Sequence, residues 1–127
     1  MTKILVVEDE KNLLKAMQEM LVKNKYQVVT ASNGKEGLAK LSVDLDLVIL
    51  DIVMPEMDGM TMFDELRKIP EYQNMPVIVL TNWTSDDAKI KTQKLGAIDY
   101  LIKSDWDISQ IIVKINAIVS KIKKNKA

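Results

Sequence analysis

The sequence contains neither cysteine nor histidine. The absence of cysteine excludes disulfides, thiol catalysis and thiolate metal sites, and it fits a reducing cytoplasm. The absence of histidine excludes imidazole zinc sites, Ser-His and Cys-His nucleophile pairs, and a role as a histidine phosphocarrier. Any chemistry in this chain therefore depends on carboxylates, hydroxyls and lysines.

Net charge and long apolar runs are also missing. Eighteen basic residues balance 18 acidic ones, so no overall field recruits nucleic acid or anionic lipid. We interpret the basic cluster at residues 121–126 as a solvated helix end. No apolar stretch approaches the roughly 18 residues of a membrane span, and the chain begins without a signal-peptide pattern. We expect a soluble, cytoplasmic protein with no direct nucleic-acid or membrane contact.

What the sequence does contain is the ordinary composition of one globular domain. It has 127 residues, of which 47% are apolar, and we expect a single domain over residues 1–127. Five short apolar runs, nearly continuous in Val, Ile and Leu, alternate with amphipathic segments. Such runs are typical of parallel strands covered on both faces. The predicted strands are 3–7, 27–31, 45–50, 76–80 and 98–102.

The segments between the runs carry helix signals. Apolar stripes at helical spacing cover Leu13 to Leu21 and Ile108 to Ile122. Helix ends are indicated by the pairs Asn33 with Glu36 and Asp107 with Gln110, by Ser85, and by Gly96 as a C-cap. Five strands joined by right-handed helical crossovers predict an α/β fold with an open, doubly wound parallel sheet. Ligands of such sheets bind outside the carboxyl ends of the strands.

Acidic residues follow two of the predicted strands. Glu8, Asp9 and Glu10 come after the first strand, and Asp51 comes after the third. These strand ends share one edge of the sheet, so Glu8, Asp9 and Asp51 should converge and repel one another. The cluster needs raised pKa values or a cation, and oxygen ligands suit Mg²⁺. The alternative is that these acidic residues only cap the helices that follow the strands. We prefer this capping role for Glu10, and the cation site for Glu8, Asp9 and Asp51.

A hydroxyl and an ammonium join this acidic edge, because Thr81 follows the fourth strand and Lys103 follows the fifth. A cation, a carboxylate, a hydroxyl donor and a lysine together suit phosphoryl transfer, with Asp51 as the nucleophile. Alone, Thr81 would be read as a helix cap and Lys103 as a surface residue. Their joint placement favours the functional reading.

Residues 51–59, with the sequence DIVMPEMDG, resemble the phosphoacceptor loop of response-regulator receiver domains. The resemblance covers nearly the whole chain and includes Glu8 with Asp9, Thr81, residues 95–97, Tyr100 and Lys103. It implies a flavodoxin-like (βα)5 fold with strand order 2-1-3-4-5. It also implies phosphorylation of Asp51 by a phosphohistidine of a sensor histidine kinase or a histidine phosphotransfer protein. The domain would catalyse only its own phosphorylation and dephosphorylation.

The same resemblance assigns further roles. Mg²⁺ would be held by the carboxylates of Glu8, Asp9 and Asp51 and by the carbonyl of Val53. The phosphoryl oxygens would be bound by Thr81 and Lys103. Thr81 would then move and Tyr100 would turn inward, changing the face made by the fourth helix, the fifth strand and the fifth helix.

The resemblance also implies two docking surfaces. Glu10 and Leu13 would bind the kinase, and a downstream protein would bind Lys89, Ile90, Gln93 and Tyr100. For Leu13 and Ile90 the alternative is core packing. Members of the family often dimerise through the fourth helix, so a homodimer on phosphorylation stays open.

Four positions depart from the family pattern or modify it. Ser104 stands where the family usually has a proline after the lysine, and Asn82 stands where many members have a small residue beside the phosphoryl group. These departures keep open a degenerate receiver that binds partners without phosphorylation. Val53 and Trp83 are apolar at positions that, in the family, influence access of water to the aspartyl phosphate, and they predict slow self-dephosphorylation.

Other classes with this layout fit less well. A flavodoxin-like FMN carrier needs a phosphate loop where the acidic residues 8–10 stand, and no glycine-rich dinucleotide fingerprint follows the first strand. An aspartate-nucleophile phosphatase of the haloacid dehalogenase type normally has a second acid at the position of Val53.

Overall fold

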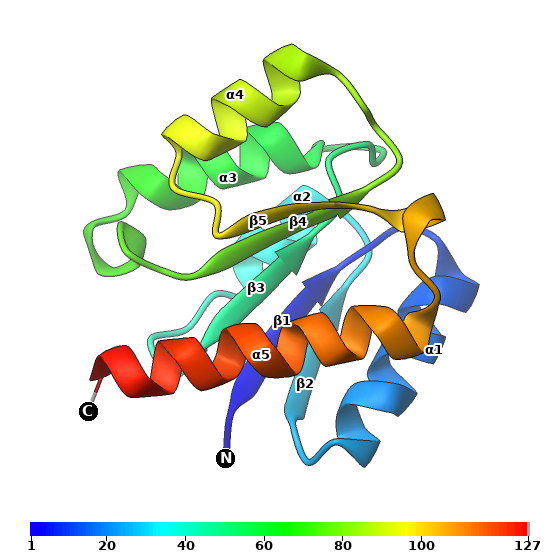
Figure 1. Ribbon diagram of the computed structural model, residues 1–127. Helices are drawn as coiled ribbons and strands as arrows, with labels where there is room; N and C mark the ends of the chain where they lie inside the picture. Colours follow the sequence, from blue (N-terminus) through cyan, green and yellow to red (C-terminus); the bar gives the residue numbers. More distant parts are fainter. Residues whose placement is uncertain (127) are drawn as a thin grey trace.

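The computed structural model describes residues 1–126. Five parallel strands form one sheet in the order β2-β1-β3-β4-β5, with helices on both faces (Figure 1). This is the predicted doubly wound fold and strand order. In chain order the elements are β1 (Lys3–Val7), α1 (Lys11–Lys23), β2 (Gln27–Ala31), α2 (Gly34–Ala39), β3 (Leu47–Leu50), α3 (Gly59–Lys68), the 3₁₀ turn η1 (Pro70–Tyr72), β4 (Val77–Thr81), α4 (Asp86–Lys94), β5 (Asp99–Ile102), the 3₁₀ turn η2 (Lys103–Asp105) and α5 (Ile108–Lys126).

The strand boundaries confirm the prediction for β1 and β2 and correct it elsewhere by one or two residues. β3 begins at Leu47, because the preceding residues form a turn in which the Leu45 N–H donates to the Ser42 carbonyl. β4 includes Thr81, because Thr81 still pairs with Ile102 of β5. Thr81 is therefore the last residue of a strand rather than the first residue of a loop.

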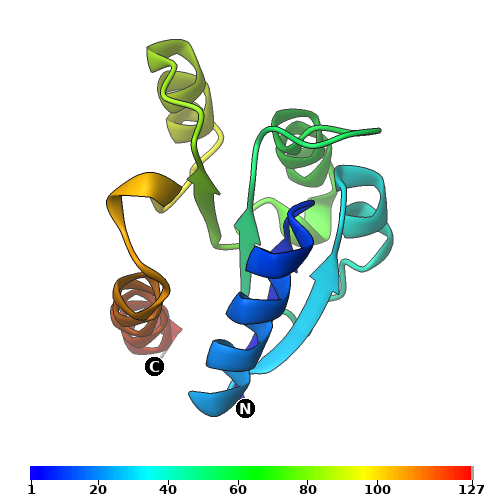
Figure 2. The ribbon, with the colours of Figure 1, turned by 90° about the vertical axis from the view of Figure 1, so that its right-hand side faces the viewer.

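Two apolar cores lie on opposite faces of the sheet. Because side chains alternate along a strand, β1 sends Ile4 and Val6 to one face and Leu5 and Val7 to the other, all at most 2% exposed. The first face packs against α1 and α5, and the second against α2, α3 and α4 (Figures 1 and 2). Double coverage explains why the strand sequences are continuously apolar. No helix in the described part of the chain combines the length and hydrophobicity that a membrane span requires.

Most of the predicted helix ends are confirmed. Asn33 caps α2 by accepting from the Glu36 N–H at 2.8 Å, and Ser85 caps α4 by accepting from the Ala88 N–H at 3.3 Å. Asp107 and Gln110 exchange two hydrogen bonds, each of 2.9 Å, at the start of α5.

The C-terminal end of α4 forms a Schellman motif. The Gly96 N–H donates to the Gln93 carbonyl and the Ala97 N–H to the Thr92 carbonyl, while Gly96 has a φ of +88°. This left-handed conformation favours glycine and turns the chain back into β5.

The capping interpretation of Glu10 is wrong. Glu10 stands at the N-cap position of α1, but its side chain accepts no hydrogen bond from the helix. Instead its main-chain N–H donates to the Glu8 carboxylate at 3.1 Å.

Strand register brings the predicted site residues to one edge. Val7 pairs with Leu50 across β1 and β3, and Thr81 pairs with Ile102 across β4 and β5. The residues that follow these strands therefore lie beside one another. After β1 the chain passes to β2 on one side, whereas β3 lies on the other side. The acidic edge is thus the topological switch point at which doubly wound sheets bind ligands.

Candidate functional site

Asp51 is fixed by the main chain on both sides of it. Its N–H donates to the Val7 carbonyl of the neighbouring strand at 3.0 Å. The following loop folds back so closely that a Cβ added to Gly59 would lie 1.9 Å from the carbonyl oxygen of Asp51. The Gly59 N–H donates to the Ile52 carbonyl at 2.8 Å and closes the loop. Only glycine fits this approach, which explains the glycine that ends the 51–59 motif.

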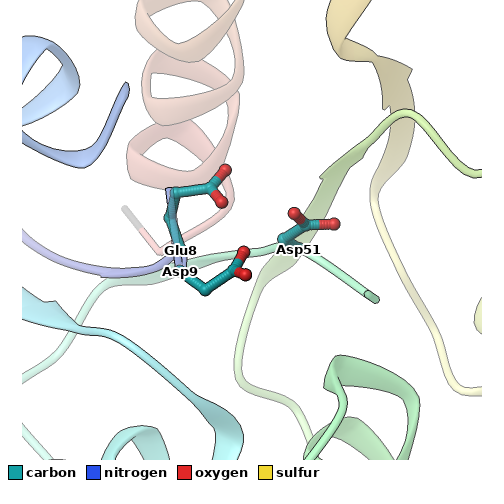
Figure 3. Close-up of side chains that lie close together, drawn as sticks. All are labelled: Glu8, Asp9 and Asp51. Carbon is teal, nitrogen blue, oxygen red and sulfur yellow. The ribbon is translucent and has the colours of Figure 1, made fainter. Parts of the chain in front are cut away.

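Three carboxylates converge as predicted. Glu8 and Asp51 are 3% and 5% exposed, whereas Asp9 is exposed. One oxygen from each of the three carboxylates lies within 4.8 Å of the others. Asp9 lies in the loop after β1, and its side chain points toward Asp51, which follows β3 (Figure 3). Two strands thus supply one acidic cluster.

The ammonium group of Lys103 lies against the two buried carboxylates. Its Nζ is 2.5 Å from Glu8 Oε1 and 2.7 Å from Asp51 Oδ2. The sequence predicted that Lys103 reaches this edge, but not that it pairs with Glu8. Charge balance could have indicated this pair. Three carboxylates at a buried edge need a counterion, and Lys103 was the one basic residue expected there.

Burial and charge pairing shift the pKa values of Glu8 and Lys103 in opposite directions. Burial raises the pKa of Glu8 to about 7, and the hydrogen bonds from Lys103 and from the Glu10 N–H offset this only in part. Burial alone would lower the pKa of Lys103, but hydrogen bonds to Asp51 and Glu8 outweigh it and raise the pKa. The site therefore holds a firmly charged ammonium beside a carboxylate that is reluctant to ionise.

The acidic cluster fits a hard divalent cation. Carboxylate oxygens are the ligands that Mg²⁺ prefers, and three of them from different positions lie within reach of one ion. Val53, whose carbonyl is the expected fourth ligand, stands beside the cluster, where its N–H donates to Asp51 Oδ1 at 3.3 Å. The carbonyl's role as a ligand stays a prediction.

A pocket of about 280 Å³ opens beside Asp51. It is lined by side chains from three segments: Asp51 and Val53, Thr81 to Trp83, and Lys103. The predicted nucleophile, hydroxyl and ammonium thus face one space. Thr81 is 1% exposed, and its Oγ1 accepts from the Trp83 N–H at 3.2 Å, which leaves the hydroxyl hydrogen free to donate elsewhere. This arrangement is suited to holding a phosphoryl group over Asp51.

An apolar groove adjoins the pocket. It has a volume of about 390 Å³ and shares Val53 and Trp83 with the pocket. These two side chains are 56% and 51% exposed. Val53 and Trp83, called here the apolar wall, thus line the same pocket as Asp51, and the slow self-dephosphorylation expected from them stays a prediction.

Tyr100 connects β5 to the segment after Thr81. Its hydroxyl donates to the Trp83 carbonyl at 2.5 Å, and the ring is half-buried. Burial, followed by the negative charge of Asp51, raises the pKa of Tyr100. The hydroxyl therefore responds to the charge of the site and is tied to the loop beside it.

The residues predicted to bind partners lie on two separate surfaces. Glu10 is exposed at the start of α1, and Leu13 is half-buried and packs into the core beneath that helix. On α4, Lys89, Ile90 and Gln93 are exposed, Ile90 to 51%. The Lys89 ammonium lies 5.9 Å from the centre of the Tyr100 ring, which places Tyr100 on the α4 surface.

Comparisons with known proteins agree with this geometry. Residues 4–116 match the family described as "Response regulator receiver domain". The response regulator SaeR of Staphylococcus aureus (strain USA300) is 33% identical over 124 residues, which cover 98% of this chain and 53% of SaeR. The chain thus spans about half the length of the curated relatives it matches.

Solved structures show the same fold. A receiver domain protein from Clostridium thermocellum is 33% identical, with a TM-score of 0.82 and coverage of 97% of this chain and 98% of that one. A CheY-like receiver domain protein from Methanospirillum hungatei JF-1 is 25% identical, with a TM-score of 0.87 and 98% coverage of both chains.

Receiver domains are generally phosphorylated on an aspartate and bind Mg²⁺ in an acidic pocket. This chain has such an acidic cluster, beside a pocket that a hydroxyl and a lysine also line, on the strand order of the family. The chain therefore belongs to the response regulator receiver domains of two-component signalling.

Proposed function

We propose that Asp51 accepts a phosphoryl group from a phosphohistidine of a sensor histidine kinase or a histidine phosphotransfer protein. The observation that carries this proposal is the buried Asp51 carboxylate, held by Lys103 at 2.7 Å on the wall of the 280 Å³ pocket. In the transfer, an Asp51 carboxylate oxygen attacks phosphorus. The bond from phosphorus to the imidazole nitrogen breaks, and its electron pair stays on the imidazole.

The chain's own contribution is to position the phosphoryl group and stabilise its charge. Lys103, already beside Asp51, would neutralise charge on one phosphoryl oxygen, and Thr81 would donate its free hydroxyl hydrogen to another. Glu8, Asp9, Asp51 and the Val53 carbonyl would hold Mg²⁺. When bound, Mg²⁺ offsets the charge of the carboxylates and of the incoming phosphoryl oxygens.

The signal would leave the site through Tyr100. A movement of Thr81 toward the phosphoryl group displaces Trp83, whose carbonyl accepts the Tyr100 hydrogen bond. Tyr100 in turn lies under Lys89. The α4-β5-α5 face would thereby change its affinity for a downstream protein at Lys89, Ile90, Gln93 and Tyr100, or for a second copy of the domain.

The remaining assignments follow from the same proposal. The donor would dock beside the site, on the surface of α1 that carries Glu10 and Leu13. The domain would catalyse only its own phosphorylation and dephosphorylation, and it would act in the cytoplasm.

Incubation with Mg²⁺ and acetyl phosphate, a small phosphodonor, should add one phosphoryl group to the protein, as measured by intact mass. Chelation of Mg²⁺ and the Asp51→Asn substitution should each abolish the adduct, because the first removes the counter-charge and the second removes the nucleophile. Absence of an adduct on the native chain, or an adduct on Asp51→Asn, would contradict the proposal. Absence of an adduct on the native chain would favour the alternative of a degenerate receiver that binds partners without phosphorylation.

The aspartyl phosphate should persist for many minutes in Mg²⁺, because neither Val53 nor Trp83 can orient an attacking water. Val53→Asn, which adds an amide there, should hasten loss of the phosphoryl mass by about tenfold or more. Val53→Ile, which stays apolar, should leave the lifetime unchanged. A lifetime of seconds in the native chain would show that the apolar wall does not exclude water.

Mg²⁺ should raise the melting temperature more at pH 8 than at pH 6. Burial raises the pKa of Glu8 to about 7 in the metal-free protein, so Glu8 keeps its proton at pH 6 and must release it when the ion binds. At pH 8 the carboxylate is already ionised and no such cost arises. In Glu8→Gln this dependence on pH should disappear. Equal increments at the two pH values in the native chain would refute the role of Glu8.

A further inference from the structure

A hydrogen bond joins the two segments that carry the phosphoryl-binding groups. The side-chain oxygen Oδ1 of Asn82 accepts from the main-chain N–H of Ser104 at 2.9 Å. Asn82 directly follows Thr81, and Ser104 directly follows Lys103. The bond, called here the 82–104 bridge, therefore joins the chain leaving β4 to the turn η2 that follows β5. Both segments lie at the carboxyl edge of the sheet, just past the ends of β4 and β5 (Figure 1).

The bridge acts on the main chain from which the Lys103 side chain projects. Lys103 opens η2, and no cis peptide bond occurs in the described part of the chain, so Lys103 and Ser104 are joined in trans. Within η2 the Trp106 N–H donates to the Lys103 carbonyl, but this hydrogen bond is long, at 3.3 Å. The shorter bond from Ser104 to Asn82 is thus the better restraint on this turn.

Both departures from the usual receiver pattern belong to this one contact. A proline at position 104 would have no N–H to donate, and a glycine or alanine at position 82 would have no side-chain oxygen to accept it. Each residue supplies what the other needs. We propose that Asn82 is a positioning residue that holds the main chain at Lys103, so that the ammonium stays against Asp51 and Glu8. This inference rests on the proposed phosphoacceptor function.

A different role for Asn82 predicts the opposite effect. Asn82 also lines the 280 Å³ pocket, and a side chain that only narrowed this pocket would slow entry of the donor. Removal of the side chain would then speed phosphorylation. If the bridge positions Lys103, removal slows phosphorylation instead, because Lys103 no longer has a fixed base from which to reach the phosphoryl oxygens.

The test compares the native chain with Asn82→Ala and Thr84→Ala, an exposed change in the same loop. The rate of adduct formation from acetyl phosphate at saturating Mg²⁺ is measured by intact mass. Asn82→Ala should react about 3- to 10-fold more slowly, the range expected for loss of one hydrogen bond. Thr84→Ala should match the native chain. Hydrogen exchange of the Ser104 amide, measured by NMR, should accelerate only in Asn82→Ala.

A second readout requires no phosphorylation. Lys103 pairs with two of the carboxylates expected to bind Mg²⁺, so a loosened Lys103 should compete less with the ion. Asn82→Ala should therefore bind Mg²⁺ several-fold more tightly by tryptophan fluorescence titration. The same substitution should have no effect in a Lys103→Ala background. A merely destabilised loop would not produce this dependence on Lys103.

Each result decides between the alternatives. An unchanged or faster rate in Asn82→Ala would overturn the positioning role, and so would an equal change in Mg²⁺ affinity in the two backgrounds. Failure of the native chain itself to form an adduct would overturn the phosphoacceptor function, while the Ser104 amide and the Mg²⁺ titrations would still test the bridge.

Discussion

The contact of one ammonium group with two buried carboxylates is the constraint on which the site depends. Glu8 and Asp51 are almost fully buried, and Lys103 lies within 2.7 Å of both. A buried carboxylate without a partner is strongly destabilising, and one ammonium cannot compensate three nearby carboxylates. The remaining negative charge favours a divalent cation, which is the role proposed for Mg²⁺. A bound cation would in turn offset the repulsion between these carboxylates and the oxygens of an incoming phosphoryl group.

The fold supplies this contact through strand register and main-chain packing. Pairing of Val7 with Leu50, and of Thr81 with Ile102, fixes which residues emerge at the edge. The approach of Gly59 to the Asp51 carbonyl then sets the direction of the loop that carries Val53. Since β3 and β4 are fully buried, small movements of these residues are costly. The mobile part of the switch is therefore expected in the Thr81 side chain, at the very end of β4, and in the exposed segments after β4 and β5.

Much of the fold and the set of site residues could be predicted from sequence, because both depend on local patterns. Continuous apolar runs locate buried parallel strands, and parallel strands bring their carboxyl ends to one edge, so Glu8, Asp9 and Asp51 could be placed together. Contacts made by loop side chains could not be predicted. The pairing of Lys103 with Glu8 and the bond from Ser104 to Asn82 depend on how separate loops meet in three dimensions. Glu10 was misassigned for the same reason: its N–H, not its carboxylate, makes the contact.

The most direct test of the site uses beryllofluoride, a stable mimic of the phosphoryl group, observed by ¹⁹F NMR. The native chain should give bound fluorine resonances, distinct from those of free beryllofluoride, only when Mg²⁺ is present. These resonances should vanish in Asp51→Asn, and in Lys103→Ala they should shift, because one fluorine loses its ammonium partner. Bound resonances that persist in Asp51→Asn, or that do not require Mg²⁺, would contradict the assignment of Asp51 and its neighbours as the phosphoryl site.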